Sequence, residues 1–137
     1  MKNILLASTS TLFNGDYLDY LLPVLKTHFK NCKTILFIPY ARPGGISYDD
    51  YTKKASDAFK IIDIEIKGLH EFKHPVEAIE KAEGIFTGGG NTFVLLNELY
   101  KNNYIDVLKN VISAGTPYLG TSAGSNICGQ NIKTTND

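Results

Sequence analysis

The stretch Tyr118-Leu119-Gly120-Thr121-Ser122-Ala123-Gly124-Ser125-Asn126 decides the fold that this 137-residue chain is expected to adopt. It begins as a short apolar run typical of a buried strand, continues as Gly-x-Ser-x-Gly, and leads into a helix-like segment. A serine in this arrangement sits on a strained turn between strand and helix, so its neighbours have to be small. The pattern predicts a nucleophile elbow that lifts the Ser122 hydroxyl into a crevice at the end of a strand.

Short apolar segments alternate with longer amphipathic ones on the amino-terminal side of this stretch. Strands are predicted over residues 4–8, 34–39, 61–67, 84–87 and 117–120. Helical spacing and end signals predict helices over residues 16–29, 47–60, 75–81, 91–100 and 104–114. Such alternation is typical of an α/β fold with an open, mostly parallel sheet and helices on both faces. No linker is evident, so residues 1–137 are expected to form a single domain.

Individual residues sharpen the helix boundaries. Pro23 should kink the first helix or mark a late start, because proline disrupts a helix interior. Ser47 and Asp50 form a Ser-x-x-acid capping pattern, Pro75 stands at the start of a helix, and Gly115 ends one. The loop over residues 40–46 follows a strand, where open parallel sheets build their ligand crevices.

Composition limits the possible partners. Fourteen Lys and Arg balance fourteen Asp and Glu, so no net charge draws the chain to nucleic acid or to an anionic membrane. No apolar stretch is long enough to span a bilayer, and the first residues do not form a signal peptide. Cys32 and Cys128 show no metal-type spacing and suit a reducing compartment as small buried hydrophobes. We therefore expect a cytoplasmic protein with a small-molecule partner, no metal and no organic cofactor.

A glycine turn over residues 87–92, Thr-Gly-Gly-Gly-Asn-Thr, follows a strand and opens a helix. Consecutive glycines let backbone N–H groups approach a substrate carbonyl closely, and the N–H of Ala123 directly after the nucleophile would be the partner donor. The turn lacks the Lys-Ser/Thr of a P-loop and the spacing of a dinucleotide fingerprint. Each motif alone also has a structural explanation: a glycine turn can simply allow a strand to meet a helix.

Together these motifs make the chain resemble peptidase E, a family of cytosolic aspartyl dipeptidases with a fold related to class I glutamine amidotransferases. The resemblance spans nearly the whole chain and rests on five segments, residues 37–41, 78–82, 88–93, 120–124 and 134–137. It implies a serine exopeptidase that cleaves dipeptides with an N-terminal aspartate.

The resemblance also assigns roles to individual residues. It implies that Ser122 is the nucleophile, that Gly89 or Gly90 forms the oxyanion hole with Ala123, and that Asn91 binds substrate. Asp137 matches a family aspartate linked to activity, which either orients a histidine or contacts the free amine of the substrate. The alternative for Asp137 is a turn residue at a frayed end.

The resemblance implies that this chain is truncated at its carboxyl end. Family members are longer, and their catalytic histidine lies beyond the segment that ends at Asp137, whereas His28, His70 and His74 match no family position. A serine hydroxyl is a poor nucleophile without a base. The chain alone is thus expected to be inactive, and its uncovered sheet edge is expected to favour a homodimer or other self-association.

Two other functions stay open from sequence. A cyanophycinase-like peptidase shares the serine elbow and the glycine turn, but the short chain and the Thr-Thr-Asn-Asp ending favour peptidase E. A catalytically dead module could keep a pocket at Ser122 and bind a small carboxylate. A class I amidotransferase is weaker, because it needs cysteine where this chain has Ser122.

Overall fold

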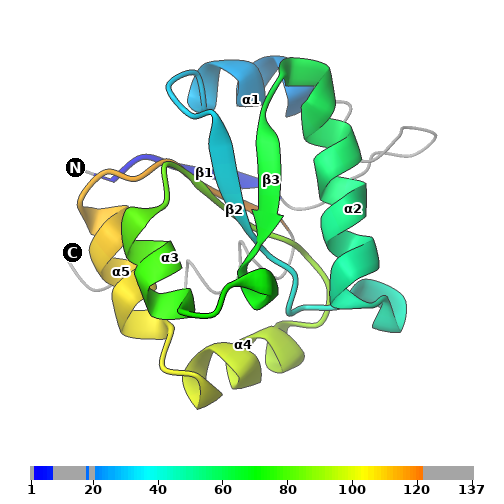
Figure 1. Cartoon of the computed structure of the whole chain (residues 1–137), viewed down its shortest axis with the longest axis vertical. Helices are drawn as coiled ribbons and strands as arrows, with labels where there is room; N and C mark the ends of the chain where they lie inside the picture. Colours follow the sequence, from blue (N-terminus) through cyan, green and yellow to red (C-terminus); the bar gives the residue numbers. More distant parts are fainter. Residues whose placement is uncertain (1, 8–17, 19–20, 122–137) are drawn as a thin grey trace.

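The structure is a computed structural model that describes residues 2–7, 18 and 21–121. The described residues form one sheet of five parallel strands in the order β1-β5-β4-β2-β3. The strands are β1 (Ile4–Ala7), β2 (Thr34–Ile38), β3 (Glu65–Gly68), β4 (Ile85–Thr87) and β5 (Tyr118–Thr121). Figure 1 shows this sheet running through the middle of the domain with helices on either side.

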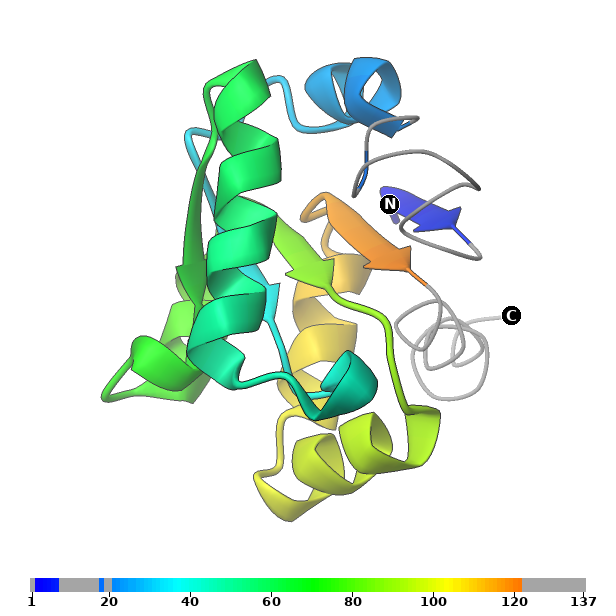
Figure 2. The same ribbon diagram turned by 90° about the vertical axis from the view of Figure 1, so that its right-hand side faces the viewer.

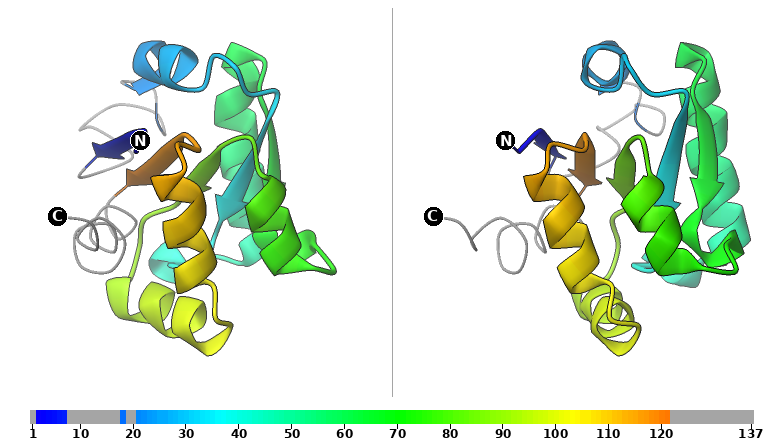
Figure 3. Two further views of the ribbon diagram at one scale, coloured as in Figure 1. Left: turned by 90° about the vertical axis from the view of Figure 1, so that its left-hand side faces the viewer. Right: turned by 60° about the vertical axis from the view of Figure 1, so that its left-hand side comes forward.

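Helices cover both faces of the sheet, as Figures 2 and 3 show. One face carries α1 (Leu22–His28) and α2 (Tyr48–Phe59), and the other carries α3 (Pro75–Lys81), α4 (Thr92–Lys101) and α5 (Ile105–Ser113). Alternate strand residues supply the two cores: Phe37 and Phe86 pack under α1 and α2, whereas Ile38 and Ile85 pack under the other three helices. This arrangement confirms the predicted open α/β sheet.

The chain runs from one edge of the sheet to the other and then back toward the first edge. It runs from β1 to β2 and β3 with helices on one face, and returns through β4 to β5 with helices on the other. Where β2 and β4 lie side by side, their following loops therefore turn to opposite faces. Ligands of open α/β sheets bind in the crevice that such a switch point creates at the carboxyl ends of the strands.

Two predicted elements are shorter than expected. The first helix begins at Leu22 with Pro23 in its first turn, and Leu18 has a φ of 64°, so the helix does not begin at residue 16. The third strand begins at Glu65 rather than residue 61, because Lys60–Ile62 extend the preceding helix as a 3-10 turn. Asp63, with a φ of 59°, then reverses the backbone before the strand.

The other boundary signals act as predicted. The Ser47 hydroxyl accepts a hydrogen bond of 3.0 Å from the Asp50 N–H at the start of α2. Pro75 is the first residue of α3, and Gly115 has a φ of 107° just after α5. Cys32 is buried, as expected of a small hydrophobe, whereas Cys128 lies outside the described residues. None of the helices in the described ranges is long and apolar enough to cross a membrane.

Candidate active site

The glycine turn after β4 is fastened to the end of β2. The N–H of Gly88 donates to the Ile38 carbonyl at 3.1 Å, and the N–H of Asn91 donates to the Ala41 carbonyl at 3.0 Å. Gly90 has a φ of 142°, and a Cβ at this position would lie 2.5 Å from the Ala41 oxygen. A side chain therefore has no room there, which explains why the turn requires glycine at position 90.

A buried tyrosine fastens the same turn from the other side. Tyr51 of α2 is 2% exposed, and its hydroxyl donates a hydrogen bond of 2.9 Å to the Gly89 carbonyl. A Cβ at Gly88 would lie 2.5 Å from the Tyr51 oxygen, so the tyrosine can approach only because residue 88 is glycine. The Tyr51 ring stands edge-on to Phe37 of β2 at a centroid distance of 4.9 Å.

Two N–H groups of the turn have no acceptor among the described residues. Those of Gly88 and Asn91 are used within the fold, whereas those of Gly89 and Gly90 donate to no other residue in the described part of the chain. Backbone N–H groups fixed in position are the usual donors to a developing oxyanion. Gly89 and Gly90 are the two residues of which the resemblance implies that one forms the oxyanion hole with Ala123.

Asn91 serves the fold as the cap of α4. Its side-chain oxygen accepts a hydrogen bond of 3.1 Å from the Val94 N–H, and the residue itself is exposed. The positive end of the α4 dipole therefore faces the same side as the glycine turn. This structural role does not test the predicted substrate contact.

A hollow of about 670 Å³ opens between the glycine turn and the loop after β2. Arg42 carries the ionisable side chain among the described residues that line it, which are Arg42, Pro43, Gly44, Gly45, Gly90, Asn91 and Val94. Its guanidinium donates to the Ile46 carbonyl at 3.0 Å and to the Gly45 carbonyl at 3.2 Å, and lies over the Tyr48 ring. These contacts hold a positive charge at the mouth of the hollow.

Strand register brings the glycine turn next to the end of β5. Thr87, which precedes the turn, pairs with Gly120, and Thr121 is the last residue of β5. Ser122 follows Thr121 directly in the sequence, but Ser122, Ala123 and Asp137 lie outside the described residues. The structure therefore brings together Gly89, Gly90 and the strand that leads to the predicted nucleophile.

The comparisons with known proteins show the family of the chain. The family model of peptidase family S51 matches residues 4–137. The chain belongs to peptidase family S51. It is 45% identical over 135 residues to Peptidase E of Shewanella amazonensis, covering 97% of this chain and 56% of that protein. It is 43% identical over 141 residues to Peptidase E of Haemophilus influenzae, covering 100% of this chain and 63% of that protein.

Solved structures show the same fold. A protein from Listeria monocytogenes, described as a putative Peptidase E, superposes with a TM-score of 0.73 at 26% identity over 93% of this chain and 62% of its own. A peptidase from an acI-B1 Actinobacterium gives a TM-score of 0.74 at 22% identity, over 93% and 57% of the two chains. The S51 chain thus spans between half and two thirds of the length of the relatives it matches.

Neither half-buried histidine of the described S51 chain contacts the glycine turn. The ring of His28 donates through Nε2 to the carbonyl of Tyr118, the first residue of β5, and so lies at the opposite end of that strand. Burial lowers the pKa of His28. His70 meets the Asp49 carboxylate at 2.7 Å beside the start of α2. His74 is exposed.

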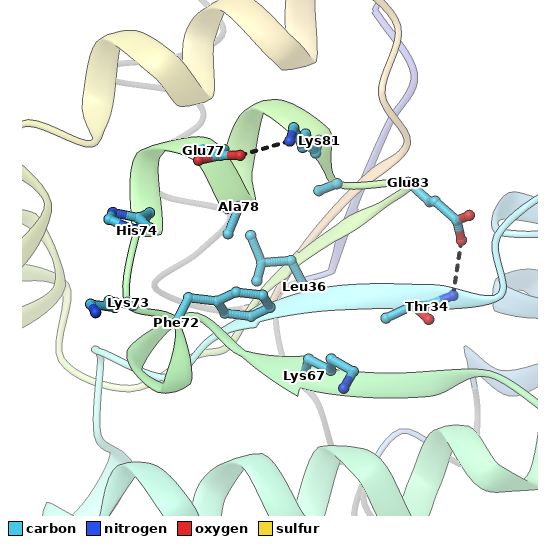
Figure 4. A pocket seen from close by; sticks show the side chains of 11 residues that line it. Thr34, Leu36, Lys67, Phe72, Lys73, His74, Glu77, Ala78, Lys81 and Glu83 are labelled. Atoms are coloured by element: carbon cyan, nitrogen blue, oxygen red, sulfur yellow. Dashed lines mark hydrogen bonds and ion pairs between the residues drawn. The ribbon is translucent and has the colours of Figure 1, made fainter.

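A second hollow, of about 440 Å³, lies between β3 and α3 (Figure 4). Leu36, Phe72 and Ala78 form its apolar floor, and several charged side chains surround it. Lys81 is paired with Glu77 at 2.6 Å, and Glu83 accepts the N–H groups of Lys33 and Thr34. The predicted site residues that the structure describes, Gly89, Gly90 and Asn91, do not line this hollow.

Three residues at the site were not anticipated from the sequence. Tyr51 belongs to the apolar face of α2 with Ala55 and Phe59, and nothing in that spacing distinguishes its hydroxyl from any core tyrosine. Thr87 and Thr121 end neighbouring strands with buried hydroxyls that have no hydrogen-bond partner among the described residues. Such unpaired groups at the carboxyl edge are consistent with a polar site.

Proposed function

We propose that the chain carries the nucleophile and the oxyanion hole of a serine exopeptidase that cleaves dipeptides with an N-terminal aspartate. The observation that carries the proposal is the pair of N–H groups at Gly89 and Gly90, which donate to no residue in the described ranges and lie beside the strand that leads to Ser122. Membership of peptidase family S51 and the relatives named Peptidase E support the same reaction class.

In the proposed reaction the Ser122 hydroxyl attacks the scissile carbonyl while a base takes its proton. The negative charge that develops on the carbonyl oxygen is stabilised by the N–H of Gly89 or Gly90 together with that of Ala123. The leaving amine takes the proton from the protonated base, and water then hydrolyses the acyl-enzyme. Asp137 either orients the base or holds the free amine of the substrate.

The base is expected to come from the part of the enzyme that the matched segment does not include. His28 is directed to the opposite end of β5, and His70 is engaged with Asp49, so the described histidines offer no base beside the glycine turn. The relatives are longer than the matched segment, which leaves room for a histidine beyond it. We therefore expect the 137-residue chain alone to have negligible turnover.

Charge at the hollow supports an acidic substrate. Arg42 holds a guanidinium at the mouth of the hollow, and the α4 amino terminus capped by Asn91 faces the same region. Both features favour a carboxylate. Asn91 is proposed to contact the substrate from this position. We further propose that the substrate is a small peptide, that the protein is cytoplasmic and that it forms a homodimer.

Labelling with a fluorophosphonate, which modifies activated serines, tests the function. The comparison uses the 137-residue chain and an extended protein, in which residues 1–137 continue into the part of Shewanella amazonensis Peptidase E beyond the matched segment. Labelling of the extended protein at Ser122, abolished by Ser122→Ala, together with cleavage of Asp-X dipeptides, is the expected result. Absence of labelling at Ser122 in both proteins would favour a module that only binds small carboxylates.

A further inference from the structure

The hydroxyl of Tyr51 makes a contact that a purely apolar core position would not need. Tyr51 lies on α2, in a different layer from the glycine turn, yet its Oη donates to the Gly89 carbonyl at 2.9 Å. The contact joins residues 38 positions apart and is buried. Hydrogen bonds in such surroundings are shielded from competing water, so they restrain geometry strongly.

This contact controls the direction of a neighbouring N–H. The Gly89 carbonyl and the Gly90 N–H belong to one planar trans peptide unit and point to opposite sides of it. With the carbonyl held toward α2 by Tyr51, the Gly90 N–H is directed away from α2. That N–H donates to no other residue in the described part of the chain. Without an anchor, a peptide between two glycines could rotate easily, because glycine accepts most backbone angles.

The tyrosine itself is held rigidly. Its ring is 2% exposed and packs edge-on against Phe37 of β2, which in turn packs against Phe86 of β4 at 4.9 Å. Gly88 adds to this fit, since a Cβ there would overlap the Tyr51 hydroxyl. The hydroxyl is therefore fixed with respect to the strand that precedes the turn.

We propose that Tyr51 is a positioning residue of the oxyanion hole, which holds the Gly89–Gly90 peptide so that the Gly90 N–H is aimed at the developing oxyanion. The inference rests on the proposed function and adds to it a residue that acts through its hydrogen bond to the Gly89 carbonyl. Its effect should appear mainly in kcat, because an oxyanion donor acts in the transition state and little in substrate binding.

The test replaces Tyr51 by phenylalanine in the extended protein, which removes the hydroxyl and keeps the ring. The matched control is Tyr104→Phe, since Tyr104 is also buried and its hydroxyl interacts with Tyr40 rather than with the glycine turn. Removal of a whole oxyanion donor lowers kcat by about 100-fold to 1,000-fold, so loosening one should slow turnover and fluorophosphonate labelling by about tenfold or more. KM should change by less than about threefold if binding is unaffected.

A rescue experiment separates positioning from general stability. 4-Aminophenylalanine at position 51 restores a donor to the Gly89 carbonyl and should recover most of the labelling rate. If Tyr51→Phe fails to fold, 4-methylphenylalanine, which fills the space of the hydroxyl without a donor, replaces it in the comparison and should label slowly.

Either of two results would overturn the inference: labelling of Tyr51→Phe at the rate of Tyr104→Phe, or no recovery with the amino analogue. These results differ from failure of the proposed function, in which the extended protein with Tyr51 intact is itself not labelled at Ser122.

Discussion

Replacing Gly90 by alanine should disrupt the glycine turn on which the site depends. Gly90 has a φ of 142°, a backbone region that L side chains rarely adopt, and an alanine Cβ would lie 2.5 Å from the Ala41 oxygen and 2.8 Å from its carbonyl carbon. The collision is with backbone, so no flexible side chain can move aside. The turn itself must shift.

The expected loss follows from two contributions. A residue forced into a glycine-only backbone region costs about 1–3 kcal/mol. Moving the turn away from Ala41 also weakens the 3.0 Å hydrogen bond from the Asn91 N–H to the Ala41 carbonyl, which contributes about 1 kcal/mol. Gly90→Ala should therefore lower the free energy of unfolding by about 3 kcal/mol, a large part of the roughly 5–15 kcal/mol of an ordinary domain.

Urea unfolding followed by circular dichroism measures this loss, with Gly44→Ala as the control. Gly44 also has a positive φ, 65°, but a Cβ there would meet no atom within 4 Å. The control should lose only about 1 kcal/mol, the usual cost of placing alanine in the left-handed region. Equal stability of Gly90→Ala and Gly44→Ala would refute the reasoning that the contact with Ala41 requires glycine.

Three further predictions concern single side chains. Burial lowers the pKa of His28, so the folded state favours the neutral imidazole, and this contribution to stability is complete above about pH 6.5 and is lost as the pH falls. In urea titrations, His28→Gln should therefore lose less stability between pH 7 and pH 5 than the unchanged chain. An equal loss of stability in the two proteins would contradict this. Thr87→Val should raise the free energy of unfolding by about 1 kcal/mol, because the buried Thr87 hydroxyl lacks a hydrogen-bond partner among the described residues. A decrease of about 1 kcal/mol in the free energy of unfolding would contradict this and imply a further partner for the hydroxyl. Ser47→Ala should lower the melting temperature by the equivalent of about 1 kcal/mol through loss of the α2 cap, whereas Ser47→Asp should retain stability.

Much of the fold could be predicted because its signals are local. Short apolar runs marked the strands, and Ser47, Pro75 and Gly115 act at helix ends as their chemistry predicts. The errors arose where the backbone departs from regular geometry. Leu18 and Asp63 have positive φ values that few non-glycine residues adopt, and apolar residues around Ile61 resemble a strand although they form a 3-10 turn.

The site could be predicted in part. The three glycines after β4 indicated a tight turn beside a strand end, and the structure explains Gly88 by the approach of Tyr51 and Gly90 by the approach of Ala41. The contact from Tyr51 could not be predicted, because it joins residues distant in sequence and depends on how α2 lies on the sheet. The strand order could not be predicted from the sequence either, and it is this order that places β4 next to β5.

The central claim is that the glycine turn provides an oxyanion donor for Ser122. A crystal structure of the extended protein after reaction with a fluorophosphonate tests it most directly. The account predicts a covalent bond from the Ser122 Oγ to phosphorus, with a phosphoryl oxygen about 3 Å from the N–H of Gly89 or Gly90. An adduct on another residue, or a phosphoryl oxygen directed away from the glycine turn, would contradict it.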